Sequence, residues 1–204
     1  MIMETDCVIL SKQPYQESAL LVRAFSPDCG RLDLIAHGAR KVTETQFPVI
    51  DLFQMLSIEY KESEKSSLGT LSNAEIRQDF SAIGENPKHM LFAGRIAQFL
   101  LDNTQPEMPM PLTFDTLVNV FSHLAEGGPE AWTMVQAAVL FKAAFLYENG
   151  LLPETEGEQG EFLEQLIDAG INNEPLPPCN PGYWSSLNRW MDQLMEYHQL
   201  KKRA

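Results

Sequence analysis

Cysteine is scarce in this sequence, and no two cysteines lie close together. Only Cys7, Cys29 and Cys179 occur in 204 residues, and none forms a C-x-x-C pair. Zinc ribbons and thioredoxin-type redox motifs need such a pair, so both are excluded. An odd, sparse cysteine count is typical of a reducing cytoplasm. We therefore expect no bound metal and no cofactor.

Long hydrophobic runs are also missing. No apolar stretch approaches the ~18 residues of a membrane-spanning helix. The start of the chain, residues 1–6, is acidic and lacks the basic-then-apolar order of a signal peptide. The hydrophobic fraction is 44% and the charged fraction 21%, which is ordinary for a globular protein. We expect a soluble, cytoplasmic protein with no membrane partner.

Positive charge is in short supply. The chain has 15 Lys and Arg against 28 Asp and Glu, a net charge of −13. Residues 1–80 carry 8 basic and 12 acidic side chains, whereas residues 81–204 carry 7 and 16. Because phosphates are repelled by a negative surface, this balance opposes nonspecific binding of nucleic acid. The N-terminal part is the less unfavourable of the two for DNA.

Recognisable catalytic motifs are absent. The sequence has no phosphate-binding Gly-rich loop, no G-x-S-x-G and no H-E-x-x-H. Its four histidines lack metal-ligand spacing: His37, His89, His123 and His198. Residues 152–175 contain seven acidic side chains and no basic one, without the Asp/Asn-and-Gly pattern of a calcium loop, which favours a solvated acidic face. We predict that the protein is not an enzyme.

The first part of the chain has the pattern of β-structure. Alternating apolar residues, bounded by turn signals such as 26–30, predict five strands. These strands cover about residues 7–10, 19–25, 31–37, 52–60 and 68–76. Five short strands with one long loop favour a small barrel such as the OB-fold, and an SH3-like barrel is not excluded.

From Pro87 onward the apolar residues recur at helical spacing. The pattern predicts helices around 90–101, 114–124, 132–147, 162–167 and 184–200, the third being the most apolar and so the centre of a bundle. The predicted fold class is α+β, with a five-stranded OB-fold barrel in residues 1–80 followed by an all-α helical domain in residues 81–204.

One candidate binding surface lies on the predicted hairpin of residues 19–37. If Leu32 and Leu34 point inward, basic and aromatic side chains point outward, and the following loop extends them. The candidate DNA-binding residues are Arg23, Phe25, Arg31, His37, Arg40 and Lys41. Cations for phosphates and a ring for base stacking are what single-strand binding requires. A mixed surface is the alternative, because four acidic residues lie in the same region: Glu17, Asp28, Asp33 and Glu44.

Four segments in a fixed order resemble the N-terminus of the RecO family. They are Val8-Ile9-Leu10, the Tyr-x-Glu-Ser stretch from Tyr15 to Leu21, the segment from Phe25 to Leu32 with its Gly-Arg turn, and Ala36 to Lys41 with Gly-Ala-Arg. Phe141 to Pro153 resembles the central helix of that family's second domain, with its Gly-x-x-Pro exit. This sequence departs from the family by having His37 where a Lys is usual. An acidic segment and Cys179 replace the four-cysteine zinc module of many members.

The resemblance implies a mediator of DNA repair and DNA recombination. Such a protein binds single- and double-stranded DNA, anneals complementary strands and helps to load recombinase on single strands coated by single-stranded DNA-binding protein. The implied partners are RecR and the acidic C-terminal tail of that coating protein. The alternative is a protein–protein adaptor with an OB-fold and weak or no DNA binding. The neutralisation of the 23–41 surface by neighbouring acids distinguishes the two.

Overall fold

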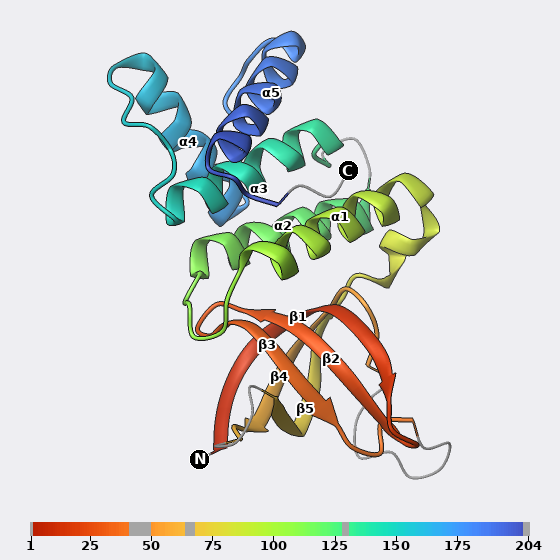
Figure 1. Cartoon of the computed structure of the whole chain (residues 1–204). Helices are drawn as coiled ribbons and strands as arrows, with labels where there is room; N and C mark the ends of the chain where they lie inside the picture. The colour runs from red at the N-terminus through yellow and green to blue at the C-terminus, as the bar shows by residue number, and fades with distance from the viewer. Residues whose placement is uncertain (1, 41–49, 64–67, 128–130, 202–204) are drawn as a thin grey trace. The chain divides into compact units, whose positions relative to one another are not determined.

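The computed structural model describes residues 2–40, 50–63, 68–127 and 131–201 (Figure 1). Strands come first in the chain and helices follow, so the predicted α+β class is confirmed. The chain divides into two compact units, Met1–Met110 and Pro111–Ala204. We call them the barrel unit and the helical unit and describe each by itself.

The barrel unit is built on five strands that close into a barrel (Figure 1). They are β1 Ile2–Tyr15, β2 Ala19–Ser26, β3 Gly30–Ala36, β4 Gln54–Lys61 and β5 Gly69–Asp79. The strand order is β1-β2-β3-β5-β4, with β4 paired back to β1. The neighbours are antiparallel except β3 and β5, which run parallel over a short stretch. This is the order of the OB-fold, so the SH3-like alternative is excluded.

The interior of the barrel follows from the two-residue period of the strands. In β3 every second residue is buried, and Leu32, Leu34 and Ala36 point inward as predicted. The parallel contact that closes the barrel pairs Leu34 with Gly69. A Cβ at Gly69 would lie 2.8 Å from the Leu34 Cδ2 atom, so a side chain at this position would force the Leu34 side chain to shift.

Strand β1 is longer than predicted and continues through Pro14. Its first half, up to Val8, pairs with β4, and its second half pairs with β2. Pro14 lies opposite Leu20 in the second half. There β1 has one paired neighbour instead of two, so the missing N–H of proline is tolerated. For that reason Pro14 does not end the strand.

After β5 the barrel unit continues with the 3-10 turn η1 Ser81–Glu85 and the helix α1 Pro87–Asn103. The Asn86 side chain accepts a hydrogen bond of 3.0 Å from the backbone N–H of Lys88 and caps α1. Helix α1 packs against β1 and η1. The compact unit therefore extends to Met110, whereas the sequence pattern places the end of the barrel domain at residue 80.

A second group of buried residues in this unit lies outside the barrel interior. Its members on the barrel and on η1 are Val8, Leu10, Phe25, Phe53, Phe80 and Ile83. The buried face of α1 contributes Ala93, Ile96, Ala97, Phe99 and Leu100. Because α1 contacts β1, part of the outer barrel surface is a packing surface and is closed to ligands.

The helical unit consists of α2 Pro111–Glu126, α3 Met134–Glu148, α4 Glu158–Asn172 and α5 Pro181–Tyr197. Helix α3 contacts the other three and is mostly buried from Ala137 to Leu146, which confirms the prediction that it is the centre of the bundle. It begins at a capping box formed by Thr133 and Gln136. Within the described residues, every helix is too short or too polar to cross a bilayer.

Two charged side chains of α3 tie the helical unit together. The Glu148 carboxylate accepts hydrogen bonds from the backbone N–H groups of Leu112 (2.9 Å) and Thr113 (2.8 Å) at the start of α2. A carboxylate is favourable there because the first N–H groups of a helix have no partner within it. The Lys142 ammonium donates to Asp192 on α5 at 2.6 Å. Both lie in the segment 141–153 that carries the second resemblance, and here they stabilise the bundle.

Candidate nucleic-acid interface

The hairpin of β2 and β3 places the predicted basic residues in register. Arg23 lies opposite Asp33, and Phe25 lies opposite Arg31. Val22 and Ala24 point into the barrel, so Arg23 and Phe25 belong to the outer face of β2, as the alternation predicted. The outer face is not uniformly exposed, however, and the six predicted residues divide into different environments.

Asp33 lies between two of the predicted cations. Its Oδ1 atom is 3.5 Å from Arg23 Nε, and its Oδ2 atom is 3.6 Å from Arg31 Nε. At these distances the contacts are ion pairs, and neither Arg31 Nε nor Asp33 Oδ1 has a hydrogen-bond partner among the described residues. Two guanidinium groups share one carboxylate, so the cluster keeps one net positive charge. Asp33 thus reduces the positive charge at this end of the candidate binding surface without abolishing it.

Arg31 is largely occupied by helix α1. Its Nη1 atom donates a 3.2 Å hydrogen bond to the carbonyl of Leu101 in the last turn of the helix. The last carbonyls of a helix lack partners within it, and a cation is favourable beside them. The Arg31 backbone N–H also donates to the Gln105 carbonyl at 3.2 Å. Arg31 therefore joins the hairpin to the end of α1.

Gly30 completes this junction. It has φ +64°, and a Cβ would lie 2.5 Å from the carbonyl oxygen of Met108 and 2.6 Å from that of Gln105. The Met110 N–H donates to the Pro27 carbonyl at 2.8 Å, and Gly30 forms a β-bridge with Pro106. Only glycine fits this conformation and this close approach. The family resemblance partly rests on this Gly-Arg turn. The turn is thus a packing surface for the segment 105–110.

The burial of Phe25 differs from the prediction that its ring is exposed. Its ring is fully buried (0% exposed) although it belongs to the outer face of β2. It is one of the buried residues of the barrel unit that lie outside the barrel interior. The prediction of an exposed stacking ring is therefore wrong. The alternation of β2 identified the outer face, but it carried no information on whether that face is covered.

His37 and Arg40 lie at the other end of the hairpin and are exposed. The Arg40 N–H donates to the Ser18 carbonyl at 3.1 Å, and its Nη1 donates to the Gln16 carbonyl at 3.4 Å. These bonds hold the 38–40 turn against the β1–β2 loop and leave the Arg40 side chain at the surface. Lys41 lies outside the described residues. At ~3.3 Å per residue, His37 is roughly 20 Å from Arg31 along β3, so the predicted residues do not form one compact patch.

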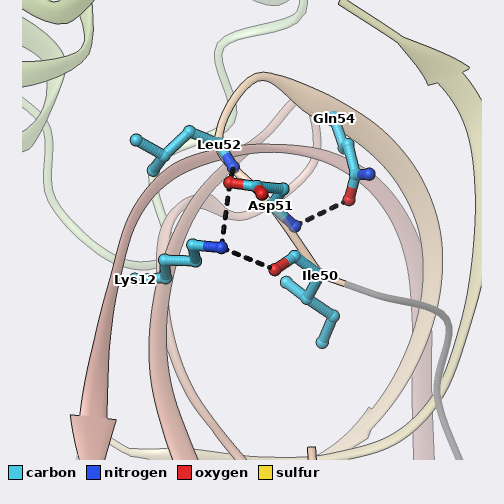
Figure 2. A network of polar contacts seen from close by, with 5 residues as sticks. All are labelled: Lys12, Ile50, Asp51, Leu52 and Gln54. Carbon is cyan, nitrogen blue, oxygen red and sulfur yellow. Dashed lines mark hydrogen bonds and ion pairs between the residues drawn. The ribbon is translucent and has the colours of Figure 1, made fainter. Parts of the chain in front are cut away.

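Lys12, a further cation on β1, is engaged in a polar network (Figure 2). Its Nζ atom is 2.9 Å from Asp51 Oδ1 and donates to the Ile50 carbonyl at 3.2 Å. The Asp51 backbone N–H donates to Gln54 Oε1 at 2.8 Å. The hydrogen bond from Lys12 holds the pKa of the Asp51 carboxyl below its usual value. Lys12 thus ties β1 to the entry into β4 and is engaged within the protein.

The sequence did not reveal the part played by residues 104–110. This segment meets the hairpin at Gly30 and Arg31, through the bonds to Gln105 and Met110 and the bridge to Pro106. Two prolines in it, at positions 106 and 109, were readable as a break after α1, but nothing in the local pattern pairs that break with Gly30. Among the described residues, no three His, Cys, Asp or Glu side chains lie close enough together to hold a metal ion.

The five-stranded barrel and its strand order define an OB-fold, which the helical unit follows in the chain. In this class the β2–β3 face and the adjoining loops bind oligonucleotides or oligosaccharides. Residues 1–80 match the family model described as "Recombination protein O N terminal". The chain belongs to the RecO family.

Three relatives illustrate the extent of the similarity. The DNA repair protein RecO of Ralstonia nicotianae is 28% identical over 170 residues, which cover 83% of this chain and 55% of the relative. That of Burkholderia orbicola is 31% identical over 150 residues, covering 73% and 51%. That of Vibrio parahaemolyticus is 30% identical over 121 residues, covering 59% and 48%. The chain spans about half the length of the curated relatives it matches.

Proposed function

We propose that this protein is a non-enzymatic mediator of DNA repair and recombination in the cytoplasm. Its barrel binds single- and double-stranded DNA, supports annealing, and assists the loading of recombinase on single strands coated by single-stranded DNA-binding protein. RecR and the tail of that coating protein are the proposed partners. The observation that carries the proposal is the OB-fold barrel in residues 1–80, matched by the family model, with exposed basic residues on its β2–β3 hairpin.

The proposed DNA surface is narrower than the six residues predicted from the sequence. Arg23, His37 and Arg40 are exposed, and Lys41 follows them in the chain. Arg31 acts chiefly as a structural residue because its Nη1 donates to the Leu101 carbonyl. With Phe25 buried, no stacking on this ring contributes to binding. The expected contacts are therefore electrostatic contacts to phosphates, few in number and strongly weakened by salt.

The adaptor function remains the second candidate, and one observation favours it. Asp33 contacts both Arg23 and Arg31, and the barrel unit as a whole carries 10 basic and 15 acidic residues. A domain with this net negative charge repels DNA over distances up to about the Debye length, which is about 8 Å at physiological salt. If Asp33 neutralises the positive charge of Arg23 and Arg31, the protein would bind DNA weakly or not at all and would still bind its protein partners.

A salt titration of single-stranded DNA binding tests the proposal. We compare the wild type with the Arg23→Ala, Arg40→Ala double variant. A charge-matched control, Arg77→Ala with Arg95→Ala, removes two exposed cations elsewhere in the same unit. Removing one phosphate interaction with a single strand lowers the salt slope by about 0.7, so the slope falls in the first variant and is unchanged in the control. Equal effects of the two variants would refute the surface. An absence of binding by the wild type at low salt would favour the adaptor.

A further inference from the structure

Two adjoining hollows lie between α4 and α5 in the helical unit. The larger has a volume of about 380 Å³ and reaches from Glu158 and Phe162 to Tyr183. The smaller has a volume of about 240 Å³ and is floored by Leu163, Leu187 and Trp190. Both are lined by Gln159 and Tyr183, so they form one continuous depression. We call it the α4–α5 groove.

The groove presents aromatic side chains to solvent. The rings of Phe162 and Tyr183 meet edge to face with centroids 5.3 Å apart, and Tyr183 is 43% exposed. Leu163 and Leu187 are buried beneath them. An exposed aromatic wall over an apolar floor is the usual composition of a binding pocket for a bulky side chain.

The charged residue that lines the groove is acidic. Glu158 lines it, and Glu154, Glu156 and Glu161 are exposed on the same stretch of chain. Residues 152–175 contain seven acidic side chains and no basic one. An acidic segment is therefore repelled, while Lys or Arg is attracted both by the carboxylates and by the faces of the exposed rings. Arg189 follows in α5 but does not line the hollows.

We propose that the α4–α5 groove binds a cationic segment of a partner protein. One bulky apolar side chain of that segment enters the floor beside Trp190, and flanking Lys or Arg side chains lie against Tyr183 and the acidic rim. This surface is separate from the β2–β3 hairpin and does not depend on DNA binding by the barrel. It also implies that an acidic peptide tail docks elsewhere on the protein.

Fluorescence anisotropy on the full chain tests this proposal with two labelled ten-residue peptides. Both carry a central Phe, flanked by Lys and Arg in one and by Glu and Asp in the other. The basic peptide is expected to bind at least about tenfold more tightly than the acidic one and to weaken with salt. Tyr183→Ala should weaken basic-peptide binding about tenfold, because it removes the cation–π interaction and the apolar wall of the groove. Tyr197→Ala, on the same helix but outside the groove, is the matched control and should bind as the wild type.

A charge variant keeps the test decisive if Tyr183→Ala disturbs the helix. Glu158→Lys replaces an exposed side chain on the groove and should weaken basic-peptide binding about tenfold, whereas Glu164→Lys, exposed on α4 and outside the groove, should have a smaller effect. Circular dichroism verifies that each variant is folded. Equal binding of the acidic peptide, no binding of the basic one, or wild-type affinity in Glu158→Lys would each overturn the proposal.

Discussion

The two ends of the β2–β3 hairpin differ in how the rest of the protein uses their basic side chains. At the turn end, Gly30 and Arg31 are bound by the end of α1 and by residues 105–110. At the open end, His37 and Arg40 stay exposed, and Arg40 donates to the carbonyls of Gln16 and Ser18. The same strand pair therefore holds a packing joint at one end and a candidate ligand surface at the other. A basic residue on an OB-fold face cannot be assigned to DNA until its intramolecular partners are known.

The largest expected effect is on stability, at Phe25. Phe25→Ala should lower the free energy of unfolding of the barrel unit by about 3–5 kcal/mol because a fully buried ring leaves a cavity. Phe25→Leu should cost less, since it keeps most of the apolar volume. Urea denaturation measures both. A Phe25→Ala protein as stable as the wild type but weaker in DNA binding would contradict the packing role.

Gly30→Ala should follow, with a decrease in stability of about 2–5 kcal/mol. The left-handed conformation costs an alanine about 1–2 kcal/mol, and the approach to the Met108 and Gln105 carbonyls adds steric strain. Gly150→Ala is the control, because Gly150 also has positive φ but has open space around it. Urea denaturation should therefore show a clearly larger decrease for Gly30→Ala. Equal decreases would mean that the packing against residues 105–110 is unimportant.

Arg31→Ala should destabilise the barrel unit by about 1.5–3 kcal/mol, the range for hydrogen bonds that involve a charged group. It removes the bond to the Leu101 carbonyl and leaves Asp33 with one cation fewer. Arg40→Ala should change stability by less than about 0.5 kcal/mol, as expected for an exposed surface position. Thermal and urea unfolding compare the two ends directly, and a reversal of this order would contradict the comparison.

The smallest expected effect on stability is at the Lys12–Asp51 ion pair. The pKa of Asp51 is lowered in the folded protein, so its contribution to stability is present above the ordinary Asp pKa and is lost as the pH falls through the folded value. Asp51→Asn should cost less than about 1 kcal/mol at pH 7 because the pair is largely exposed. The difference between wild type and variant should shrink steadily as the pH is lowered through the folded pKa of Asp51 and vanish below it. A difference that persisted there would disprove the ion-pair origin.

Local patterns in the sequence were sufficient for the barrel. The two-residue period placed Leu32, Leu34 and Ala36 inside, and the turn signal at residues 26–30 located the hairpin, because both depend on neighbouring residues alone. The environment of Arg31 depends on Leu101 in α1 and on Gln105, far away in the chain. Alternation assigns a side chain to a face, but it cannot show what covers that face.

The resemblance to a family identified the protein better than it identified the site. The Gly-Arg turn is part of the family resemblance, and the structure gives it a packing role through Gly30 φ and the Arg31 bond to Leu101. Similarly, Glu148 in the second matched segment caps α2. The alternation and the resemblance together predicted six DNA-binding residues, and they could not separate residues that hold the fold from residues that face a ligand.

The division of the hairpin into a packing end and a ligand end can be tested by chemical-shift mapping of the barrel unit's amides. The full chain is titrated with a single-stranded oligonucleotide at low salt. We expect shifts at Arg23 and at residues 37–40, with little change at residues 26–31 and 101–110, where Gly30 and Arg31 hold the packing joint. Shifts centred on Gly30 and Arg31, with none at residues 37–40, would contradict it.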